Sequence, residues 1–187
     1  MRIISGKLKG NTLHTPKDNN TRPLKDLARE SIFNLLTHSN KVSLKLERSN
    51  ILDLYAGTGS FGLECLSRQA RSVYFVENQK NAINILEKNV EKLKVKKKIK
   101  IFINDVFDLI EKKNTLKIKF NLIFCDPPFK DDNIKNLIKL IFEKNLLIKN
   151  GIIIIHRNIA SNEHFPDQFK ILDQRFYGKS KIIFGSF

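Results

Sequence analysis

From residue 50 onward, short apolar runs alternate with segments whose apolar residues recur at helical spacing. The predicted strands cover residues 51–55, 72–76, 99–103, 120–125 and 151–156, and the predicted helices cover residues 61–68, 80–93, 106–113 and 133–144. Runs that are apolar throughout are typical of parallel strands covered by helices on both faces, because neither face of such a sheet meets water. The alternation therefore predicts an α/β fold built on a Rossmann-like parallel sheet.

The chain ahead of this alternation has a different pattern. Residues 2–13 alternate short apolar stretches with Gly6 and Gly10, which predicts a small β-hairpin. Residues 24–37 carry apolar side chains at helical spacing and follow Pro23, a residue that suits a first helical turn. A hairpin and a helix are therefore expected before the sheet begins.

The end of the chain also departs from the alternation. Residues 169–177 and 181–187 have no helix between them and are separated at Gly178, which predicts an antiparallel strand pair that closes the sheet. A length of 187 residues suits one hydrophobic core, so we expect a single domain. Its amino-terminal extension covers residues 1–40 and its core covers residues 41–187.

The chain is strongly basic, with 34 Lys and Arg against 19 Asp and Glu and a formal net charge of +15. Such a surface attracts polyanions, so RNA, DNA and an anionic membrane face are all candidate partners. Codon bias is the alternative source of part of this charge, because the chain is also rich in Asn and Ile. Even the longest apolar runs, such as residues 152–155, are far below the ~20 residues that span a bilayer. Since no signal-peptide pattern follows Met1, we expect a cytoplasmic protein without a membrane partner.

The cysteines and histidines give no signal of a metal site. Cys65 and Cys125 lie among apolar residues, where free thiols behave as small buried hydrophobes, and this favours a reducing compartment. None of the cysteines and histidines has the spacing of a zinc site. We expect no metal, and we interpret as structural all four histidines: His14, His38, His156 and His164.

A glycine-rich motif runs from the first predicted strand into the helix behind it. It reads Asp-Leu-Tyr-Ala-Gly-Thr-Gly-Ser-Phe-Gly over residues 53–62. Ligands of open α/β sheets bind beyond the carboxyl ends of the strands, and glycines there let a ligand approach the backbone closely. Glu77, at the end of the next strand, can accept hydrogen bonds from both hydroxyls of a ribose. The residues predicted to bind a nucleoside cofactor are Asp53, Ala56, Gly57, Gly59 and Glu77.

The same glycines also match the G-x-G-x-x-G motif of a dinucleotide site, which makes NAD the rival cofactor. Asp53 distinguishes the two cofactors. An anionic side chain at the base of the loop repels the pyrophosphate of a dinucleotide, whereas it complements the cationic amino-acid end of S-adenosylmethionine. The motif therefore favours S-adenosylmethionine.

A second motif, Asp126-Pro127-Pro128-Phe129, directly follows the predicted strand 120–125. The exocyclic amine of a nucleic-acid base is a poor nucleophile because its lone pair is conjugated into the ring. The Asp126 carboxylate and the Pro127 carbonyl can accept the two N–H bonds of such an amine and so favour a pyramidal nitrogen with its lone pair directed at a methyl donor. Phe129 can stack on the base, which an enzyme has to flip out of a helix to reach. These four residues form the predicted catalytic loop of a base methyltransferase.

The two motifs together resemble motifs I and IV of the class I amino-methyltransferases, in which an [N/D]-P-P-[Y/F/W] loop holds the target nitrogen. The resemblance implies that Glu77 binds the ribose of S-adenosylmethionine. It also implies that Asp105, in the segment Asn104-Asp105-Val106, contacts the adenine amino group. Asn104 and Asp105 thus join the predicted cofactor site.

The amino-terminal part resembles the opening of the RsmD family of bacterial 16S ribosomal RNA guanine-N2 methyltransferases. The matching segments are Met1-Arg2-Ile3-Ile4-Ser5-Gly6, Lys9-Gly10, Thr21-Arg22-Pro23, Asp26, Arg29-Glu30, Phe33-Asn34 and, near the end of the chain, Tyr177-Gly178-Lys179-Ser180. The resemblance covers essentially the whole chain, and the Thr-Arg-Pro segment is its most specific part. The chain departs from the family at Phe129, where tyrosine is common, and at Leu24, where a small polar residue is frequent.

This resemblance implies a seven-stranded, mostly parallel sheet with helices on both faces. It implies an enzyme that methylates N2 of a guanine in 16S rRNA, within the assembled or assembling small ribosomal subunit. The residues expected to contact the RNA are Arg22, Arg29, Lys7 and Lys9. We expect the protein to act as a monomer.

Four other functions fit parts of the pattern. A DNA adenine-N6 methyltransferase uses the same Asp-Pro-Pro-aromatic loop, but it usually carries a target-recognition region for which this chain has no room. A glutamine-N5 protein methyltransferase would favour asparagine in place of Asp126. An NAD-dependent oxidoreductase is disfavoured by Asp53 and by the lack of a placed acid or base for hydride transfer. A non-catalytic RNA-binding assembly factor stays open, although the intact Asp126 and Phe129 argue against it.

Overall fold

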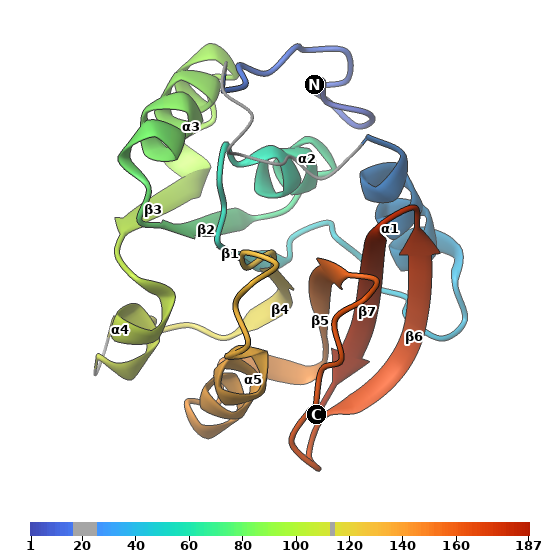
Figure 1. The fold of residues 1–187 in the computed structure, drawn as a ribbon. Helices are drawn as coiled ribbons and strands as arrows, with labels where there is room; N and C mark the ends of the chain where they lie inside the picture. Colours follow the sequence, from blue (N-terminus) through green and yellow to red (C-terminus); the bar gives the residue numbers. More distant parts are fainter. Residues whose placement is uncertain (17–25, 113–114) are drawn as a thin grey trace.

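The computed structural model of the chain describes residues 1–16, 26–112 and 115–187. Figure 1 shows a seven-stranded sheet flanked by helices. The strands are β1 (Asn50–Leu54), β2 (Ser72–Glu77), β3 (Ile99–Ile103), β4 (Phe120–Cys125), β5 (Leu147–Asn158), β6 (Lys170–Tyr177) and β7 (Ser180–Ser186). The helices are α1 (Asp26–His38), α2 (Ser60–Ser67), α3 (Lys80–Lys92), α4 (Val106–Glu111) and α5 (Ile134–Glu143), with one 3₁₀ turn, η1 (Lys96–Lys98). The predicted α/β class and the seven-stranded sheet are confirmed.

The strand order of the sheet is β3-β2-β1-β4-β5-β7-β6. Strands β1 to β5 pair in parallel, and β7 runs antiparallel to both of its neighbours, β5 and β6. The predicted antiparallel pair is therefore confirmed, although β7 inserts beside β5 and leaves β6 at the edge. Strand β5 also continues past the predicted range 151–156, because Arg157 and Asn158 pair with Lys181 and Ser180 of β7.

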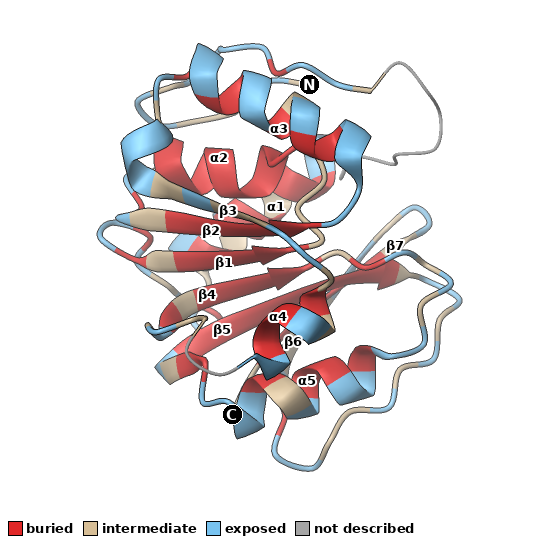
Figure 2. Cartoon of the chain, turned by 90° about the vertical axis from the view of Figure 1, so that its left-hand side faces the viewer, coloured by how far each residue is buried: buried red, intermediate tan, exposed pale blue. Residues whose placement is uncertain are grey.

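The helices on the two faces of the sheet bury two separate apolar clusters (Figure 2). Helices α1, α2 and α3 pack on one face, and α4 and α5 pack on the other. Successive residues of β4 alternate between the clusters, so that Phe124 faces α2 while Ile123 and Cys125 face the opposite side. Phe124 stacks on Phe61 of α2 with ring centroids 3.9 Å apart, and burying a side chain of this size stabilises the fold by ~1.5–3 kcal/mol. The strands that carry the two sequence motifs are thus held from both sides.

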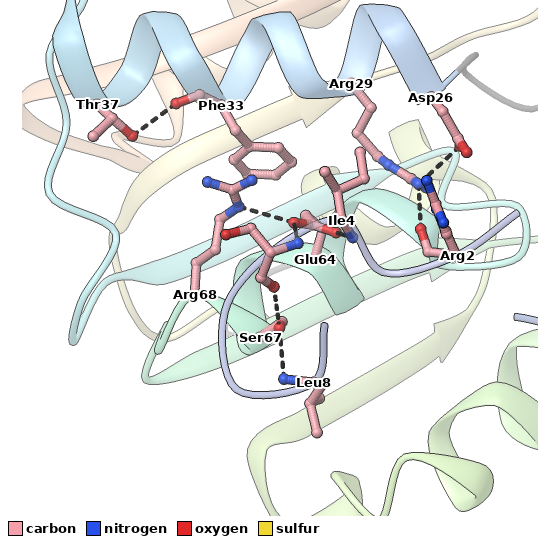
Figure 3. A network of polar contacts seen from close by, with 11 residues as sticks. Arg2, Ile4, Leu8, Asp26, Arg29, Phe33, Thr37, Glu64, Ser67 and Arg68 are labelled. Carbon is pink, nitrogen blue, oxygen red and sulfur yellow. Dashed lines mark hydrogen bonds and ion pairs between the residues drawn. The ribbon is translucent and has the colours of Figure 1, made fainter. Parts of the chain in front are cut away.

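The predicted amino-terminal hairpin is only partly formed, which corrects the sequence analysis. A single antiparallel bridge joins Arg2 and Thr12. The N–H of Ser5, which a longer ladder would use, donates instead to Glu64 of α2 at 3.0 Å. Buried Glu64 also accepts the N–H of Ile4 at 2.7 Å (Figure 3). Residues 1–16, here called the arm, therefore form a loop anchored to α2 rather than a pair of strands.

The cysteines, the start of α1 and the possibility of a membrane-spanning helix can also be compared with the structure. Cys65 and Cys125 are free and buried, as predicted. Helix α1 begins at Asp26, and the predicted helical residues 24 and 25 lie outside the described residues. None of the helices in the described ranges is both long enough and apolar enough to cross a membrane.

Candidate active site

The glycine-rich loop, residues 55–59, joins the end of β1 to the start of α2. Gly57 and Gly59 both have positive φ angles, of 54° and 79°. A Cβ atom on Gly57 would meet nothing within 4 Å, whereas one on Gly59 would lie 2.3 Å from the Leu86 side chain of α3. One glycine therefore leaves open space beside the backbone for a ligand, and the other lets the loop pack closely on α3.

Glu77, the last residue of β2, holds this loop in place. Its Oε2 accepts the N–H of Gly57 at 2.7 Å, and its Oε1 accepts the N–H groups of Asn78 and Gln79 at 2.9 and 2.8 Å. A carboxylate offers about four acceptor positions, so these three bonds leave capacity for one further donor such as a ribose hydroxyl. The buried Glu77 thus has room for one of the two ribose hydroxyl bonds predicted for it.

Asp53 lies beneath the loop rather than on its surface. The side chain is buried, and its Oδ2 accepts the N–H of Gly62 at 2.9 Å, which fixes the first turn of α2. Burial raises the pKa of Asp53 well above its ordinary value; the Gly62 bond lowers this pKa, and nearby Asp126 and Glu77 raise it further. A buried acid in such surroundings is stabilised as a carboxylate by a cation placed close to it. Together with the open backbone at Gly57, this fits a cationic nucleoside such as S-adenosylmethionine.

Asp105 lies at the carboxyl end of the neighbouring strand pair. Glu77 pairs with Ile103 at the ends of β2 and β3, and Asp105 follows two residues later as the N-cap of α4. Its Oδ1 accepts the N–H of Phe107 at 2.8 Å, which fixes the carboxylate at the helix start. The predicted cofactor residues are therefore brought to the ends of three adjacent strands, with Asn104 exposed beside them.

The glycine-rich loop is also tied to the arm. Buried Asn89 of α3 accepts the N–H of His14 at 2.7 Å through its Oδ1 and donates from Nδ2 to the Thr58 carbonyl at 3.1 Å. The amide of Asn89 thus links α3, the loop and the arm at one point. No spacing in the sequence pointed to Asn89.

The Asp-Pro-Pro-Phe loop, residues 126–129, begins where β4 ends. Because Leu54 pairs with Cys125, the end of β1 lies directly beside it, and the N–H of Asp126 donates to the Leu54 carbonyl at 3.3 Å. The Asp126 side chain is 22% exposed, so its carboxylate can reach a bound substrate. The two predicted motifs therefore meet at adjacent strands of the sheet.

Arg157 of β5 holds this second loop, and the sequence analysis did not identify it. The buried guanidinium donates to the Pro128 carbonyl at 3.1 Å and to the Asp131 carbonyl at 2.6 Å. It also donates to Glu163 at 2.8 Å, and Glu163 forms a second ion pair with Lys181 of β7. The two carbonyl bonds fix the backbone at Pro128, in the loop, and at Asp131, just after it.

His156, which the sequence analysis interpreted as a structural residue, lies directly against the loop. Cys125 pairs with Ile155, so Asp126 and His156 are neighbours at the next position of β4 and β5. The Nδ1 atom of His156 lies 2.8 Å from Oδ1 of Asp126, and its ring meets that of Phe129 edge to face with centroids 5.4 Å apart. The sequence feature that could have identified His156 is the polar pair His156-Arg157, which directly follows the apolar run 152–155.

Of the residues predicted to contact RNA, Arg29 does not lie at the surface. Arg29 is fully buried, and its Nη2 donates to the Arg2 carbonyl and to Asp26 (Figure 3). This corrects the prediction for Arg29, whose spacing to Ile32, Phe33 and Leu36 places it on the buried stripe of α1.

Lys7 and Lys9 are exposed on the arm near Ser67, at the carboxyl end of α2, and so lie about one helix length of ~12 Å from the glycine-rich loop. Arg22 lies outside the described residues. In the described parts of the chain, no group of three or more His, Cys, Asp or Glu side chains is arranged to hold a metal ion.

The fold and the site together define a class I methyltransferase, the class that takes its methyl group from S-adenosylmethionine. The chain superposes with a TM-score of 0.84 on the solved structure described as "Putative methyltransferase yhhF from Escherichia coli", at 24% sequence identity. The match covers 99% of this chain and 96% of that chain. At this identity the match supports the fold.

The chain belongs to the family described as Conserved hypothetical protein 95, whose model matches residues 1–186. It is 34% identical over 154 residues to the "Putative rRNA methyltransferase YlbH" of Bacillus subtilis, covering 82% of this chain and 80% of that protein. It is 32% identical over 178 residues to the "Ribosomal RNA small subunit methyltransferase D" of Haemophilus influenzae, covering 95% of this chain and 89% of that protein. The resemblance to the RsmD family is therefore confirmed for a family that contains proteins of both names.

Proposed function

We propose that this chain transfers a methyl group from S-adenosylmethionine to the exocyclic N2 amine of a guanine in 16S rRNA of the small ribosomal subunit. The observation that carries the proposal is the position of Asp126, which is part-exposed at the end of β4, beside the strand that leads into the glycine-rich loop. The net charge of +15 suits a polyanionic substrate. The name of the Haemophilus influenzae relative supports small-subunit rRNA as that substrate.

The proposed chemistry assigns one acceptor to each N–H bond of the amine. The Pro128 carbonyl already accepts from Arg157 and from the N–H of Asp131, so the Pro127 carbonyl and the Asp126 carboxylate are assigned to the amine. S-adenosylmethionine supplies an electrophilic methyl group. As the N–C bond forms, the S–C bond breaks and its electron pair stays on sulfur, while the Asp126 carboxylate accepts the proton that the nitrogen loses.

The proposed base and RNA contacts follow from the same loop and from the arm. Phe129 would stack on a flipped-out guanine, a contact of ~1–3 kcal/mol in comparable sites. Exposed Lys7 and Lys9 would contact RNA phosphates away from the reacting base. Since Asn89 ties the arm to the glycine-rich loop, RNA bound along the arm would be held in a fixed position relative to the cofactor site.

Transfer of a labelled methyl group tests this proposal. Small ribosomal subunits, protein-free 16S rRNA and duplex DNA would each be incubated with labelled S-adenosylmethionine and with the wild-type or the Asp126→Ala protein. We expect label in at least one ribosomal substrate with the wild-type protein and none with the variant. Label in DNA alone would replace RNA by DNA as the substrate. An absence of label in all three would refute the proposal and favour a non-catalytic assembly factor.

A further inference from the structure

His156 contacts two of the four residues of the Asp-Pro-Pro-Phe loop. Its imidazole is 4% exposed, with Nδ1 2.8 Å from Oδ1 of Asp126 and Nε2 2.9 Å from the hydroxyl oxygen of Ser180. The edge-to-face contact with Phe129 has an interplanar angle of 80°. A single buried ring is therefore in contact with both the carboxylate and the aromatic ring that are proposed to receive the target base.

The partners of the imidazole define which ring nitrogen faces which group. An ionised Asp126 can only accept a hydrogen bond, so Nδ1 carries the proton and donates it to Oδ1. The Ser180 hydroxyl, which can both donate and accept, bonds to Nε2 and completes the hydrogen bonding of the ring. Because Asp126 and Ser180 bond to opposite edges of the ring, the imidazole is held in one orientation.

The two strands beside β4 determine this geometry. Ser180 pairs with Asn158, two residues beyond His156 along β5, so its hydroxyl lies diagonally across from the imidazole. The next side chain, Arg157, bonds to the Pro128 and Asp131 carbonyls instead. The two neighbouring residues of β5 thus contact different parts of this segment: Arg157 bonds to its backbone, and His156 contacts the side chains of Asp126 and Phe129.

We propose that His156 is a positioning residue for the methyl transfer, acting through Asp126. By occupying Oδ1, the Nδ1–H group directs Oδ2 toward the exocyclic amine and keeps the carboxylate from rotating. The inference rests on the proposed function, because it assigns His156 a part in the same reaction.

Two substitutions separate this role from a structural one. In His156→Asn, the amide nitrogen can take the place of Nδ1 and still donate to Asp126, whereas in His156→Gln the amide reaches the position of Nε2 beside Ser180. We expect His156→Asn to keep kcat within about 3-fold of the wild type. We expect His156→Gln to lower it by about 10- to 100-fold, by analogy with the loss of a partner that orients a metal-binding side chain.

Binding of S-adenosylmethionine, measured by calorimetry, and thermal stability serve as controls for both variants. In the described residues the hydrogen bonds and ring contact of His156 go to Asp126, Ser180 and Phe129 and not to the glycine-rich loop, so the Kd for the cofactor should be unchanged in both. In an Asp126→Asn background, where the orienting bond no longer acts on a carboxylate, adding His156→Gln should lower kcat no further than Asp126→Asn does alone.

Equal loss of kcat in His156→Asn and His156→Gln, or no loss in either, would overturn the inference while leaving the proposed function intact. A wild-type protein that methylates no substrate would overturn both. An active wild type in which His156→Asn retains activity and His156→Gln loses it would support the positioning role.

Discussion

Replacement of Arg157 by methionine is the most quantitative test of how the target loop is held. Arg157 is 1% exposed and makes three hydrogen bonds, at 3.1 Å to Pro128, 2.6 Å to Asp131 and 2.8 Å to Glu163. Methionine is of similar length and fills much of the same space, so the change removes polar contacts more than it opens a cavity. It removes the guanidinium donor from the carbonyls of Asp131 and Pro128, of which Pro128 still accepts from the N–H of Asp131. It also leaves the Glu163 carboxylate with Lys181 and Ser161 as its remaining partners.

The expected loss follows from these contacts. Removing one partner of a buried ion pair costs ~3–5 kcal/mol, and the remaining Lys181 bond places Arg157→Met at the lower end, about 3 kcal/mol in the free energy of unfolding. For a protein of 187 residues this corresponds to a fall in Tm of about 6–12 °C. The loosened loop should also lower kcat, because Asp126 and Phe129 lose a fixed backbone.

Urea unfolding of the apo protein measures this loss, and Arg175→Met is its matched control. Arg175, on β6, is 47% exposed and pairs with Asp173 at 2.8 Å, so its replacement should cost less than about 1 kcal/mol. A loss in Arg157→Met no larger than in Arg175→Met would refute the view that the buried guanidinium holds the loop.

Three further substitutions test the cofactor site and the reaction. Gly57→Ala has a matched control in Gly178→Ala, because both glycines have positive φ and open space where a Cβ would lie. Each variant should lose ~1–2 kcal/mol of stability by backbone strain. In calorimetry only Gly57→Ala should weaken S-adenosylmethionine binding, and equal binding in both would contradict the assigned site. Asp126→Ala should keep the cofactor Kd and lower kcat at least 100-fold, and a fully active variant would defeat the mechanism. Burial raises the pKa of Asp53, so above pH ~3.9 this carboxyl keeps its proton in the folded protein and loses it in the unfolded chain. The contribution of Asp53 to stability therefore falls as pH rises from ~3.9 toward the raised pKa. Asp53→Asn should lack this fall, so urea unfolding should find the apo variant more stable than the wild type at pH 7 but not near pH 3. The variant should also bind S-adenosylmethionine about 10-fold more weakly. A stability difference between variant and wild type that does not change with pH would contradict the role assigned to Asp53.

The sheet could be predicted from the sequence because its strands are short runs that are apolar throughout. The bounds of β3 and β4 agree with the prediction, since both strands are flanked by polar residues on each side. The two chemical motifs were found for a related reason. Glycine-rich and proline-rich loops after core strands have few structural uses, and the topology of an open sheet brings their ends to one edge.

His156 and Arg157 could not be identified in the same way. Each is a single polar residue after an apolar run, and neither has a spacing that marks a site. Their role depends on the register of β4 with β5 and on β7, which extends β5 by pairing with Arg157 and Asn158. Such long-range pairing is not visible in local patterns.

The errors at the amino-terminal end have a different cause. Gly6 and Gly10 correctly indicated turns, but the intervening amides bond to Glu64 and Ser67 of α2 and leave only one bridge of the hairpin. Arg29 was assigned to RNA contact through the family resemblance, although its position on the helical stripe with Ile32 and Phe33 pointed inward. In both cases tertiary contacts outweighed the ordinary preference of the residue type.

The most direct test of the central claim is the chemical identity of the methylated nucleoside. Small-subunit rRNA methylated by the wild-type protein would be digested to nucleosides and analysed by mass spectrometry against standards, with the Asp126→Ala reaction as the blank. We predict N2-methylguanosine as the product, absent from the blank. A methyl group on a base carbon, on a ring nitrogen or on a ribose oxygen would contradict a site built to hold an exocyclic amine.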